Sequence, residues 1–412
     1  MLRLHIENTL DEENKMKICK LSDIARFTTG KLNSNAATMK GRYPFFTCAP
    51  KPLTIDTYAY DTKAVILAGN NAEGNFHIQY YEGKFNAYQR TYIIETNDET
   101  IVDIRYLYYA LKICLLHFKQ ISQGTATKFL TAKILNAFEL PIPRIEEQQK
   151  IAFLLAEIDE KIKTNEIINN NLEQQAKTLF KSWFVDFEPF DESFVDSPIG
   201  TKIPHSLQMV QIGSLSHILE TGKRPKGGAV ATGVPSIGAE NVKRLGEVNF
   251  ASAKYIPVEF AQKMDKGKVH GYELMLYKDG GKPGTFIPHF SMFGEGFPYD
   301  DFYINEHVFK LDFGDKGFNE FCYFYLQTDY PYNWLANNGG KAAVPGINQQ
   351  DVNSIWIYHP DNPIVKEYCK WVQPIFTTIL RNCSQNVKLS QLRDALLPKL
   401  MSGELDVSDI EI

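Results

Sequence analysis

Residues 146–184 read EEQQKIAFLLAEIDEKIKTNEIINNNLEQQAKTLFKSWF, and their apolar side chains recur at alternating steps of four and three. The apolar positions of this seam are Ile151, Leu155, Ile158, Ile162, Leu172, Ala176 and Leu179. Two polar residues, Asn165 and Asn169, interrupt the seam. Heptad spacing of this kind is typical of a long helix that packs along a second helix. The stretch therefore predicts one half of a coiled coil.

A second seam lies 217 residues further along the chain. Its positions are Tyr368, Val372, Ile375, Ile379, Asn382, Asn386, Leu389, Arg393 and Leu396. Asparagines again interrupt it, at the places that correspond to Asn165 and Asn169. Polar residues in a seam cost stability but select one alignment of the two helices. We therefore expect an antiparallel pair in which Asn165 faces Asn386 and Asn169 faces Asn382. The alternative is that both stretches are ordinary core helices that tolerate asparagine.

The segments outside the two helices repeat as well. Thr29-Gly30-Lys31 recurs 192 residues later as Thr221-Gly222-Lys223. From Tyr92 onward the separation stays at 217, so Tyr106-Leu107-Tyr108 falls on Tyr323-Phe324-Tyr325. A constant offset over such a length indicates an internal duplication. The repeat implies two copies of one unit related by pseudo-twofold symmetry.

Each copy mixes short β-type runs, bounded by Gly and Asn turns, with isolated helices, which predicts an α+β fold. Each copy is also expected to open with a short amphipathic helix, at residues 18–25 and 212–218, that stops before a glycine. The predicted architecture has two globular domains separated by two long antiparallel coiled-coil helices. The expected boundaries are residues 1–145 (first domain), 146–187 (first helix), 188–361 (second domain) and 362–412 (second helix and tail). Four heptads extend about 43 Å at about 1.5 Å per residue, enough to hold the domains at a fixed distance.

Composition limits the class of protein. The 412 residues carry a net charge of −5 and no apolar run of the length that a membrane span requires. The acidic start, residues 1–14, lacks the pattern of a signal peptide. Six widely spaced cysteines show neither metal-ligand spacing nor a disulfide framework, so we expect a cytoplasmic protein without a metal site. Residues 17–143 nevertheless hold 15 basic and 10 acidic side chains, and residues 201–282 hold 12 and 7. This local basicity favours a nucleic-acid partner modestly.

Polar loops in both copies offer the side chains that read DNA. Amides and guanidinium groups read base edges, and nearby amines hold phosphates. The candidates in the first copy are Lys31, Asn33, Asn35, Asn70, Asn71, Gln123, Thr125, Thr127 and Lys128. Those in the second copy are Lys223, Arg224, Asn241, Lys243, Arg244, Lys282, Asn337, Asn338 and Lys341. Loops are rich in Asn, Gly and Lys in any protein, so a single residue carries little weight. The paired loops 123–128 and 337–341 carry more, because both precede equivalent apolar residues.

One arrangement leaves an enzymatic hypothesis open. Asp61, Glu82 and Lys84 have the acid-then-E-x-K order of many metal-dependent nucleases, in which carboxylates hold Mg²⁺ and the lysine steadies a water. The second copy has no equivalent. No nucleotide-binding loop with full spacing, methyltransferase tetrapeptide or GxSxG motif occurs. No catalytic residue and no cofactor site is therefore assigned to this chain.

Several ordered motifs resemble the specificity subunits of Type I restriction–modification systems. They are Gly124-Thr125-Ala126, residues 140–143 followed by Glu147-Gln148 and Ile151, Ile158-Asp159 with Lys161-Ile162, residues 179–187 (LFKSWFVDF) and residues 392–404 (LRDALLPKLMSGE). The resemblance covers essentially the whole chain after residue 15. One departure is Asp361-Asn362-Pro363, which stands near the place of Glu146-Glu147-Gln148, so the second helix is expected to begin differently.

This resemblance implies two target-recognition domains, each of which reads one half of a split double-stranded DNA target. An antiparallel helical spacer would fix the gap between the halves. Methylation and cleavage would belong to partner subunits: two methyltransferase subunits that use S-adenosylmethionine, and restriction subunits that use ATP and Mg²⁺. The chain itself would be non-catalytic. A metal-dependent nuclease and a two-lobed protein-interaction scaffold remain the alternative functions.

Overall fold

The computed structural model describes residues 16–341 and 344–410 of the chain, which fold into two compact units. The first unit holds the described residues up to Lys161 and those from Leu389 on, and the second holds Ile162–Lys388. The acidic segment 1–14 lies outside the described residues. The expected mixture of helices and strands is confirmed, and none of the helices in the described ranges combines the length and hydrophobicity that a bilayer requires.

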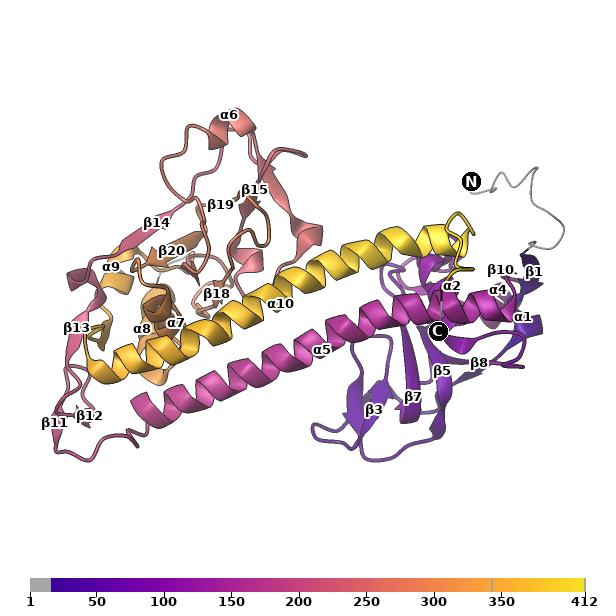
Figure 1. Ribbon diagram of the computed structural model, residues 1–412, viewed down its shortest axis with the longest axis horizontal. Helices are drawn as coiled ribbons and strands as arrows, with labels where there is room; N and C mark the ends of the chain where they lie inside the picture. The colour runs from indigo at the N-terminus through magenta and orange to yellow at the C-terminus, as the bar shows by residue number, and fades with distance from the viewer. Residues whose placement is uncertain (1–15, 342–343, 411–412) are drawn as a thin grey trace. The chain divides into compact units, whose positions relative to one another are not determined.

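The first unit is built on a six-stranded sheet (Figure 1). Its strands, in spatial order, are β2 (Ala25–Thr29), β8 (Thr91–Thr96), β5 (Tyr60–Ala68), β7 (Ile78–Ala87), β3 (Tyr43–Phe46) and β4 (Leu53–Ile55). Two small ladders pair β1 (Lys17–Lys20) with β10 (Glu139–Ile142) and β6 (Asn70–Asn71) with β9 (Lys128–Phe129). The short helices are α1 (Leu21–Ile24), α2 (Ile104–Ile113), α3 (Leu115–Ile121) and α4 (Ala132–Asn136), with a 3₁₀ turn at Ser34–Ala36.

Both faces of the central strands are buried, because alternate residues point to opposite sides of a strand. Val65 and Leu67 face helix α2, whereas Ala64 and Ile66 enter a smaller core with Phe46 and Phe85. The larger core also contains residues of the long helix α5 (Ile145–Phe184) and of α10 (Pro363–Met401), drawn in magenta and yellow in Figure 1. Those residues are Ile151, Ala152 and Leu155 of α5 and Leu397, Leu400 and Met401 of α10.

A buried amide ties the start of α5 to this core. Gln148 is fully buried, and its side chain accepts a hydrogen bond from the Asp103 backbone N–H at 3.0 Å. It donates to the backbone carbonyls of Ile101 and Pro143 at 2.9 and 2.8 Å. Asp103 in turn caps α2 by accepting from the Tyr106 N–H. Loss of the Gln148 amide would leave these buried groups unpaired, at about 1–3 kcal/mol for each.

The second unit contains a four-stranded sheet with the order β14 (Ile218–Thr221), β20 (Val308–Asp312), β17 (Leu274–Tyr277) and β18 (Phe290–Met292). A three-stranded sheet has the order β16 (Lys254–Ile256), β15 (Val234–Ile237) and β19 (Tyr303–Ile304). The two-stranded ladders are β11 (Phe194–Asp196) with β12 (Lys202–Pro204), and β13 (Met209–Gln211) with β21 (Trp356–Tyr358). The helices are α6 (Val258–Ala261), α7 (Lys316–Tyr325), α8 (Asp329–Gly339) and α9 (Gln349–Asn353), with 3₁₀ turns at Ile212–Ser214, Ala239–Asn241 and Phe250–Ser252.

Aromatic rings dominate the core of the second unit. Phe180 and Phe184 of α5 pack against Phe321 of α7 and Tyr368 of α10, with ring centroids 5.0–5.5 Å apart. Most of these contacts are edge-to-face, the arrangement that aromatic rings favour. The Tyr368 hydroxyl donates to the Ala176 carbonyl of α5 at 3.1 Å, so the buried phenol has a partner. Helix α10 begins at Pro363, and the Asn362 side chain accepts from the Ile364 N–H, a proline-led helix start that α5 lacks.

The prediction of a short amphipathic helix at the start of each copy is wrong. Residues 17–29 form β1, a single helical turn and β2, and residues 212–221 form a 3₁₀ turn and β14. Gly30 does not stop a helix: a Cβ there would lie 2.0 Å from the Ala87 carbonyl oxygen. Gly222 meets the same constraint against Ile304, at 1.6 Å. Both glycines therefore permit a close approach of two backbones beside a strand end.

Candidate nucleic-acid interface

The four seam asparagines form two hydrogen-bonded pairs within the second unit. Asn165 donates to the side-chain oxygen of Asn386 at 2.8 Å, and Asn382 donates to that of Asn169 at 2.8 Å. Asn165 is 1% exposed and also donates to the Gln385 side chain at 2.9 Å. These contacts run in opposite directions along α5 and α10, so the two helices are antiparallel here. That the asparagines select this alignment stays a prediction.

Three strand ends of the first unit meet at one edge of the sheet. Thr29, the last residue of β2, pairs with Tyr92, and Ala68, the last residue of β5, pairs with Thr91, the first residue of β8. The residues that follow β2 and β5 and precede β8 therefore lie together. We call this group the first edge. It includes the candidates Lys31 and Asn33 after β2, and Asn70 and Asn71 after β5.

A short ladder brings the loop 123–128 to the first edge. Asn70 pairs with Phe129 and Asn71 with Lys128, and Gln123 forms a β-bridge with Phe129. The loop between carries Thr125 and Thr127, and residues 123–126 are exposed. The side chains of two candidates, Asn70 and Asn71, also form local hydrogen bonds. The Asn71 side-chain oxygen accepts from the backbone N–H groups of residues 73 and 75, and that of Asn70 accepts from Cys48 Sγ at 2.8 Å.

The turn Tyr88-Gln89-Arg90 joins the two halves of the first edge. Gln89 donates to the Asn33 side-chain oxygen at 3.0 Å, and the Arg90 guanidinium lies 5.4 Å from the centroid of the Phe129 ring. Sequence reasoning missed both Gln89 and Arg90. Their position just before β8, in a turn that the 217-residue offset maps onto the residues before β20, could have revealed them. Asn35 is exposed in the neighbouring 3₁₀ turn.

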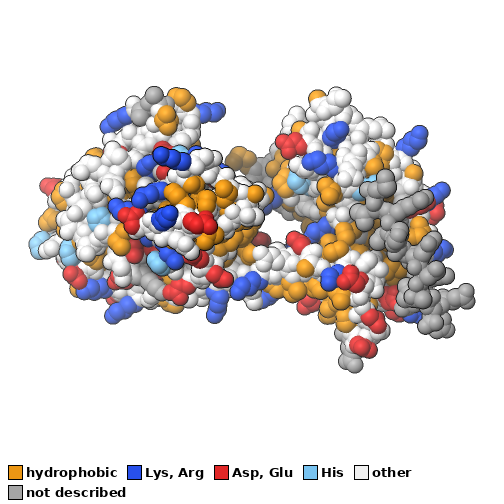
Figure 2. Space-filling model, turned by 90° about the horizontal axis from the view of Figure 1, so that it is seen from above, with side chains coloured by type: hydrophobic (Ala, Val, Ile, Leu, Met, Phe, Trp, Pro, Cys, Tyr) orange, Lys and Arg blue, Asp and Glu red, His pale blue; other side chains and the backbone are white. Residues whose placement is uncertain are grey.

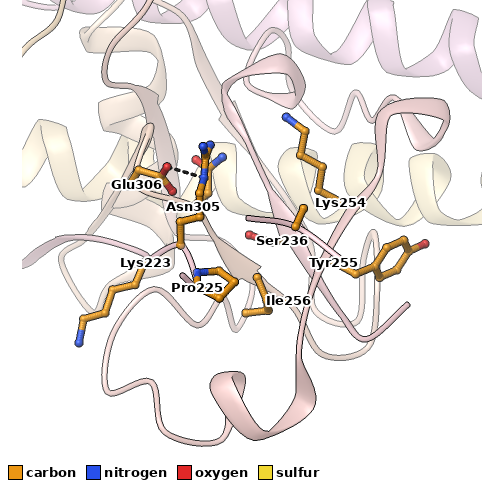
Figure 3. A pocket seen from close by; sticks show the side chains of 10 residues that line it. Lys223, Pro225, Ser236, Lys254, Tyr255, Ile256, Asn305 and Glu306 are labelled. Carbon is orange, nitrogen blue, oxygen red and sulfur yellow. Dashed lines mark ion pairs between the residues drawn. The ribbon is translucent and has the colours of Figure 1, made fainter. Parts of the chain in front are cut away.

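The second unit has an edge with the same strand arrangement. Thr221, which ends β14, pairs with Phe309, and Tyr277, which ends β17, pairs with Val308, the first residue of β20. We call the residues beyond these ends the second edge. Lys223 and Arg224 follow β14, and Lys282 follows β17 in an exposed loop. Lys223 and Arg224 border a cavity of about 240 Å³, which is also lined by Pro225, Ala229, Ser236, Lys254, Tyr255, Ile256, Asn305 and Glu306 (Figure 3).

Three cations at the second edge, Lys223, Arg224 and Lys278, contact carboxylates. Lys223 contacts Asp265 at 2.8 Å, and Arg224 Nε contacts Glu306 at 2.7 Å, the ion pair drawn as a dashed line in Figure 3. Lys278 contacts Asp279 at 2.8 Å, and His307 hydrogen-bonds the same carboxylate. Burial raises the pKa of Asp279, but the hydrogen bonds from Lys278 and His307 outweigh it and leave that pKa below its ordinary value. Figure 2 shows Lys and Arg side chains of the second unit, at the left, interspersed with Asp and Glu.

The candidates at residues 337–341 do not form the expected loop. Asn337 and Asn338 lie in the last turn of α8, which continues to Gly339 because its apolar residue Leu335 is buried and extends the helix into the core. Lys341 follows the helix and donates to the Asn338 side chain at 2.7 Å. The Cβ position of Gly340 is 3.4 Å from the Gly284 carbonyl oxygen. The end of α8 therefore contacts the loop that carries Lys282, at the second edge.

The three remaining candidates of the second copy differ from one another. Asn241 is 4% exposed, and its side-chain oxygen accepts from the Asn249 N–H at 2.7 Å. In this structure its buried, bonded amide is not presented to a base edge, and its role in reading DNA stays a prediction. Arg244 lies 3.9 Å from Glu173 of α5, and Lys243 is exposed.

The arrangement proposed for a nuclease does not form a metal site. Asp61 pairs with Lys84 and Lys63 with Glu82 across β5 and β7, and all four side chains are exposed. Glu82 contacts Lys63 at 3.8 Å and accepts from the Tyr80 hydroxyl at 3.0 Å. Throughout residues 16–341 and 344–410, no three His, Cys, Asp or Glu side chains are grouped to hold a metal ion.

The fold is that of a known class of proteins. The chain superimposes on a solved structure, the S subunit of a Type I restriction–modification system from M. genitalium, with a TM-score of 0.62, 16% sequence identity, and coverage of 95% of this chain and 98% of that one. The family model described as "Type I restriction modification DNA specificity domain" matches residues 13–174.

Two relatives are similar over most of their length. The specificity subunit of the Type I restriction enzyme MjaIX from Methanocaldococcus jannaschii is 29% identical over 322 residues, which cover 74% of this chain and 70% of the relative. The specificity subunit of the enzyme EcoDI from Escherichia coli is 26% identical over 432 residues, which cover 94% and 88%. Residues 13–174 of this chain therefore match a Type I restriction modification DNA specificity domain, and the chain is similar over most of its length to Type I specificity subunits.

Proposed function

We propose that the chain reads a bipartite target in double-stranded DNA with two target-recognition domains that are copies of one unit. The observation that carries this proposal is the equivalence of the two edges. Thr29 pairs with Tyr92 as Thr221 pairs with Phe309, at the ends of β2 and β14. Tyr92 and Phe309 are 217 positions apart, as are helices α4 and α9 and residues 129 and 346 of the adjoining bridges.

The side chains at the two edges suit two kinds of DNA contact. The exposed amines of Lys31, Lys282 and Lys341 and the half-buried Lys128 offer positive charge to phosphates, which position a protein but do not read sequence. Amides such as Asn33, Gln123 and Asn337 match the donor and acceptor pattern of adenine in the major groove. Carboxylates already neutralise Lys223 and Arg224, so contact with DNA there requires an exchange of partners.

We propose that the paired helices act as the spacer between the two half-sites. Helix α5 has 40 residues and α10 has 39. At about 1.5 Å per residue each would extend about 60 Å. The predicted spacer segments, 146–187 and 362–412, enclose nearly all of both helices. The asparagine pairs support this role, since buried polar pairs in a seam hold one alignment of two helices.

The proposed activity of the chain is non-catalytic. Two methyltransferase subunits would supply S-adenosylmethionine chemistry, and restriction subunits would supply ATP-driven translocation and Mg²⁺-dependent cleavage. The chain would scaffold these partners on its target, in the cytoplasm, with no cofactor of its own. The names of the relatives, which are specificity subunits of restriction enzymes, support this division of labour.

Genome-wide mapping of methylated adenine tests the proposal. The chain is expressed with the methyltransferase subunits of its system in a host that lacks adenine methylation of its own. The expected result is one motif with two short defined halves and an undefined gap of fixed length. Methylation without such a motif would contradict the bipartite reading. Cleavage of DNA by the purified chain alone with Mg²⁺, abolished by Glu82→Ala, would contradict the non-catalytic role.

A further inference from the structure

Arg90 at the first edge is held in a fixed position by three neighbours. Its carbonyl accepts a hydrogen bond from the Gly69 N–H at 2.8 Å and one from Cys48 Sγ at 3.5 Å. Its guanidinium lies over the Phe129 ring, 5.4 Å from the centroid. A guanidinium at this distance from an aromatic face gains a cation–π attraction. The backbone is therefore anchored to β5, and the planar side chain rests on a ring.

The charge of Arg90 is not neutralised within the part of the chain that the structure describes. Five other arginines are paired with carboxylates there, whereas Arg42, Arg105 and Arg381 are not among those pairs: the pairs are Arg26 with Glu95, Arg144 with Glu147, Arg224 with Glu306, Arg244 with Glu173 and Arg393 with Asp159. No carboxylate of the described residues lies within ion-pair distance of Arg90, and its side chain is exposed. An exposed cation without an internal partner is available to an anionic or electronegative ligand.

The second copy has different chemistry at the equivalent place. The offset of 217 maps Arg90 onto His307 and Phe129 onto Gly346, and the bridge from Asp279 to Gly346 stands where Asn70 pairs with Phe129. His307 there hydrogen-bonds Asp279 and lies 3.2 Å from Glu306. The ring beneath the side chain is gone, and a carboxylate replaces the neutral amide. Among the residues that the structure describes, the second copy has no guanidinium stacked on a ring at the equivalent place.

We infer that Arg90 reads a guanine in the half-site recognised by the first domain, by two hydrogen bonds to O6 and N7 in the major groove. This inference rests on the proposed function. The planar guanidinium fork matches the two acceptors of guanine, and a side chain already oriented by a ring loses little entropy on binding. Amines at the same edge, on Lys31 and Lys128, supply the charge that phosphates require, so the fork of Arg90 is left for a base.

The test compares the wild type with R90A, R90M and R42A, each expressed with the methyltransferase subunits, and maps the methylated motif in the genome. Arg42 is a matched control, because it is exposed and comes before β3, at the opposite end of that strand from Cys48. In R90A one guanine of one half-site becomes degenerate, with discrimination reduced between about 5-fold and about 140-fold. The rest of the motif and the R42A motif stay unchanged.

Retention of every guanine in R90A overturns the inference, as does a wild-type motif without a guanine in that half-site. Uniformly weaker binding of R90A to all DNA, with a shallower salt dependence, also overturns it, because Arg90 would then contact a phosphate. R90M keeps much of the side-chain length without the N–H donors and decides the question if R90A fails to accumulate: loss of the guanine preference supports the inference, and retention refutes it. If Lys128→Ala weakens DNA binding while R90A keeps its motif, the inference fails and the proposed function stands.

Discussion

Arg393 of α10 donates to the Asp159 carboxylate of α5 at 2.6 Å, and the Tyr109 hydroxyl donates to the other oxygen of that carboxylate at 2.8 Å. Arg393 occupies a seam position that most coiled coils give to an apolar residue. Within the first unit, this ion pair joins both long helices to α2. A charged pair that is largely shielded from water becomes costly when one partner is lost.

Arg393→Ala should therefore destabilise the first unit, by about 1–3 kcal/mol, since the partly buried Asp159 loses its charged partner. Denaturant unfolding followed by circular dichroism measures the change. Arg381→Ala is the matched control, because Arg381 lies on the same helix and is exposed. Equal stability of the two variants would show that the ion pair contributes nothing measurable.

Because Asn165 and Asn386 are hydrogen-bonded to each other, the effects of substituting them on stability should not be additive. Asn165→Leu should cost about 1–3 kcal/mol, because it leaves the Asn386 amide without its side-chain partner. The double variant Asn165→Leu with Asn386→Leu should recover much of that loss, since two apolar residues fill a seam well. A double-mutant cycle by thermal unfolding gives the coupling energy. Additive single effects would argue against a coupled pair.

The lysines at the two edges predict a change in salt dependence. Lys128→Ala and Lys341→Ala should each weaken DNA binding of the assembled complex and reduce the slope of log affinity against log salt by about 1. Lys63→Ala serves as the control, because Lys63 lies on the exposed face of β5 and contacts Glu82. Fluorescence anisotropy between 50 and 200 mM salt measures the slope. An unchanged slope would remove that lysine from the interface.

Asp279 predicts a dependence of stability on pH. Its pKa in the folded chain is lowered, so it contributes stability above its unfolded value of about 3.9, and that contribution is lost as pH falls through the folded value. The melting temperature of the second unit should decrease when the pH is lowered below about 4. Asp279→Asn should have a lower melting temperature at neutral pH, and its melting temperature should depend less steeply on pH in the acid range. If the melting temperatures of the two proteins decrease with the same slope in acid, other groups account for the loss of stability.

The spacer proposal predicts a change in the DNA target itself. Insertion of four residues, about one helical turn, into both α5 and α10 adds about 6 Å of helix. The undefined gap in the methylated motif should then lengthen by about one to two base pairs, with both half-sites unchanged. A gap of unaltered length would refute the spacer role. Insertion of four residues into the turn at 197–200, which joins β11 to β12, is the control and should leave the gap unaltered.

The long-range organisation could be predicted from the sequence because heptad seams and constant offsets are periodic. Asn165 and Asn386 were found by that periodicity, and the resemblance to Type I specificity subunits was found from motifs of fixed order. The local structure near the strand starts was less predictable. Residues 18–25 look amphipathic, but Lys17–Lys20 pair with β10, and only a single helical turn remains. Tertiary pairing overrode the local pattern.

Candidate site residues were harder to choose, because residue type does not report burial or partners. Asn241 and Asn33 are both loop asparagines, yet one is buried beneath Asn249 and the other is exposed beside Gln89. Arg90 was missed because neither its residue type nor its turn shows what lies beneath the side chain. Its significance comes from Phe129, which lies 39 residues away in the sequence (129 minus 90) and beneath the guanidinium in space.

The core of the first unit contains Leu397, Leu400 and Met401 from the end of α10, alongside residues from the start of the chain. During synthesis the first domain therefore emerges from the ribosome long before the residues that complete its core are made. The second unit, residues 162–388, already has all of its own core residues when residues 397–401 are synthesised. The domain made first is consequently the domain finished last, and a chain that stops before residue 397 leaves an apolar surface of the N-terminal domain uncovered for chaperones and proteases to find.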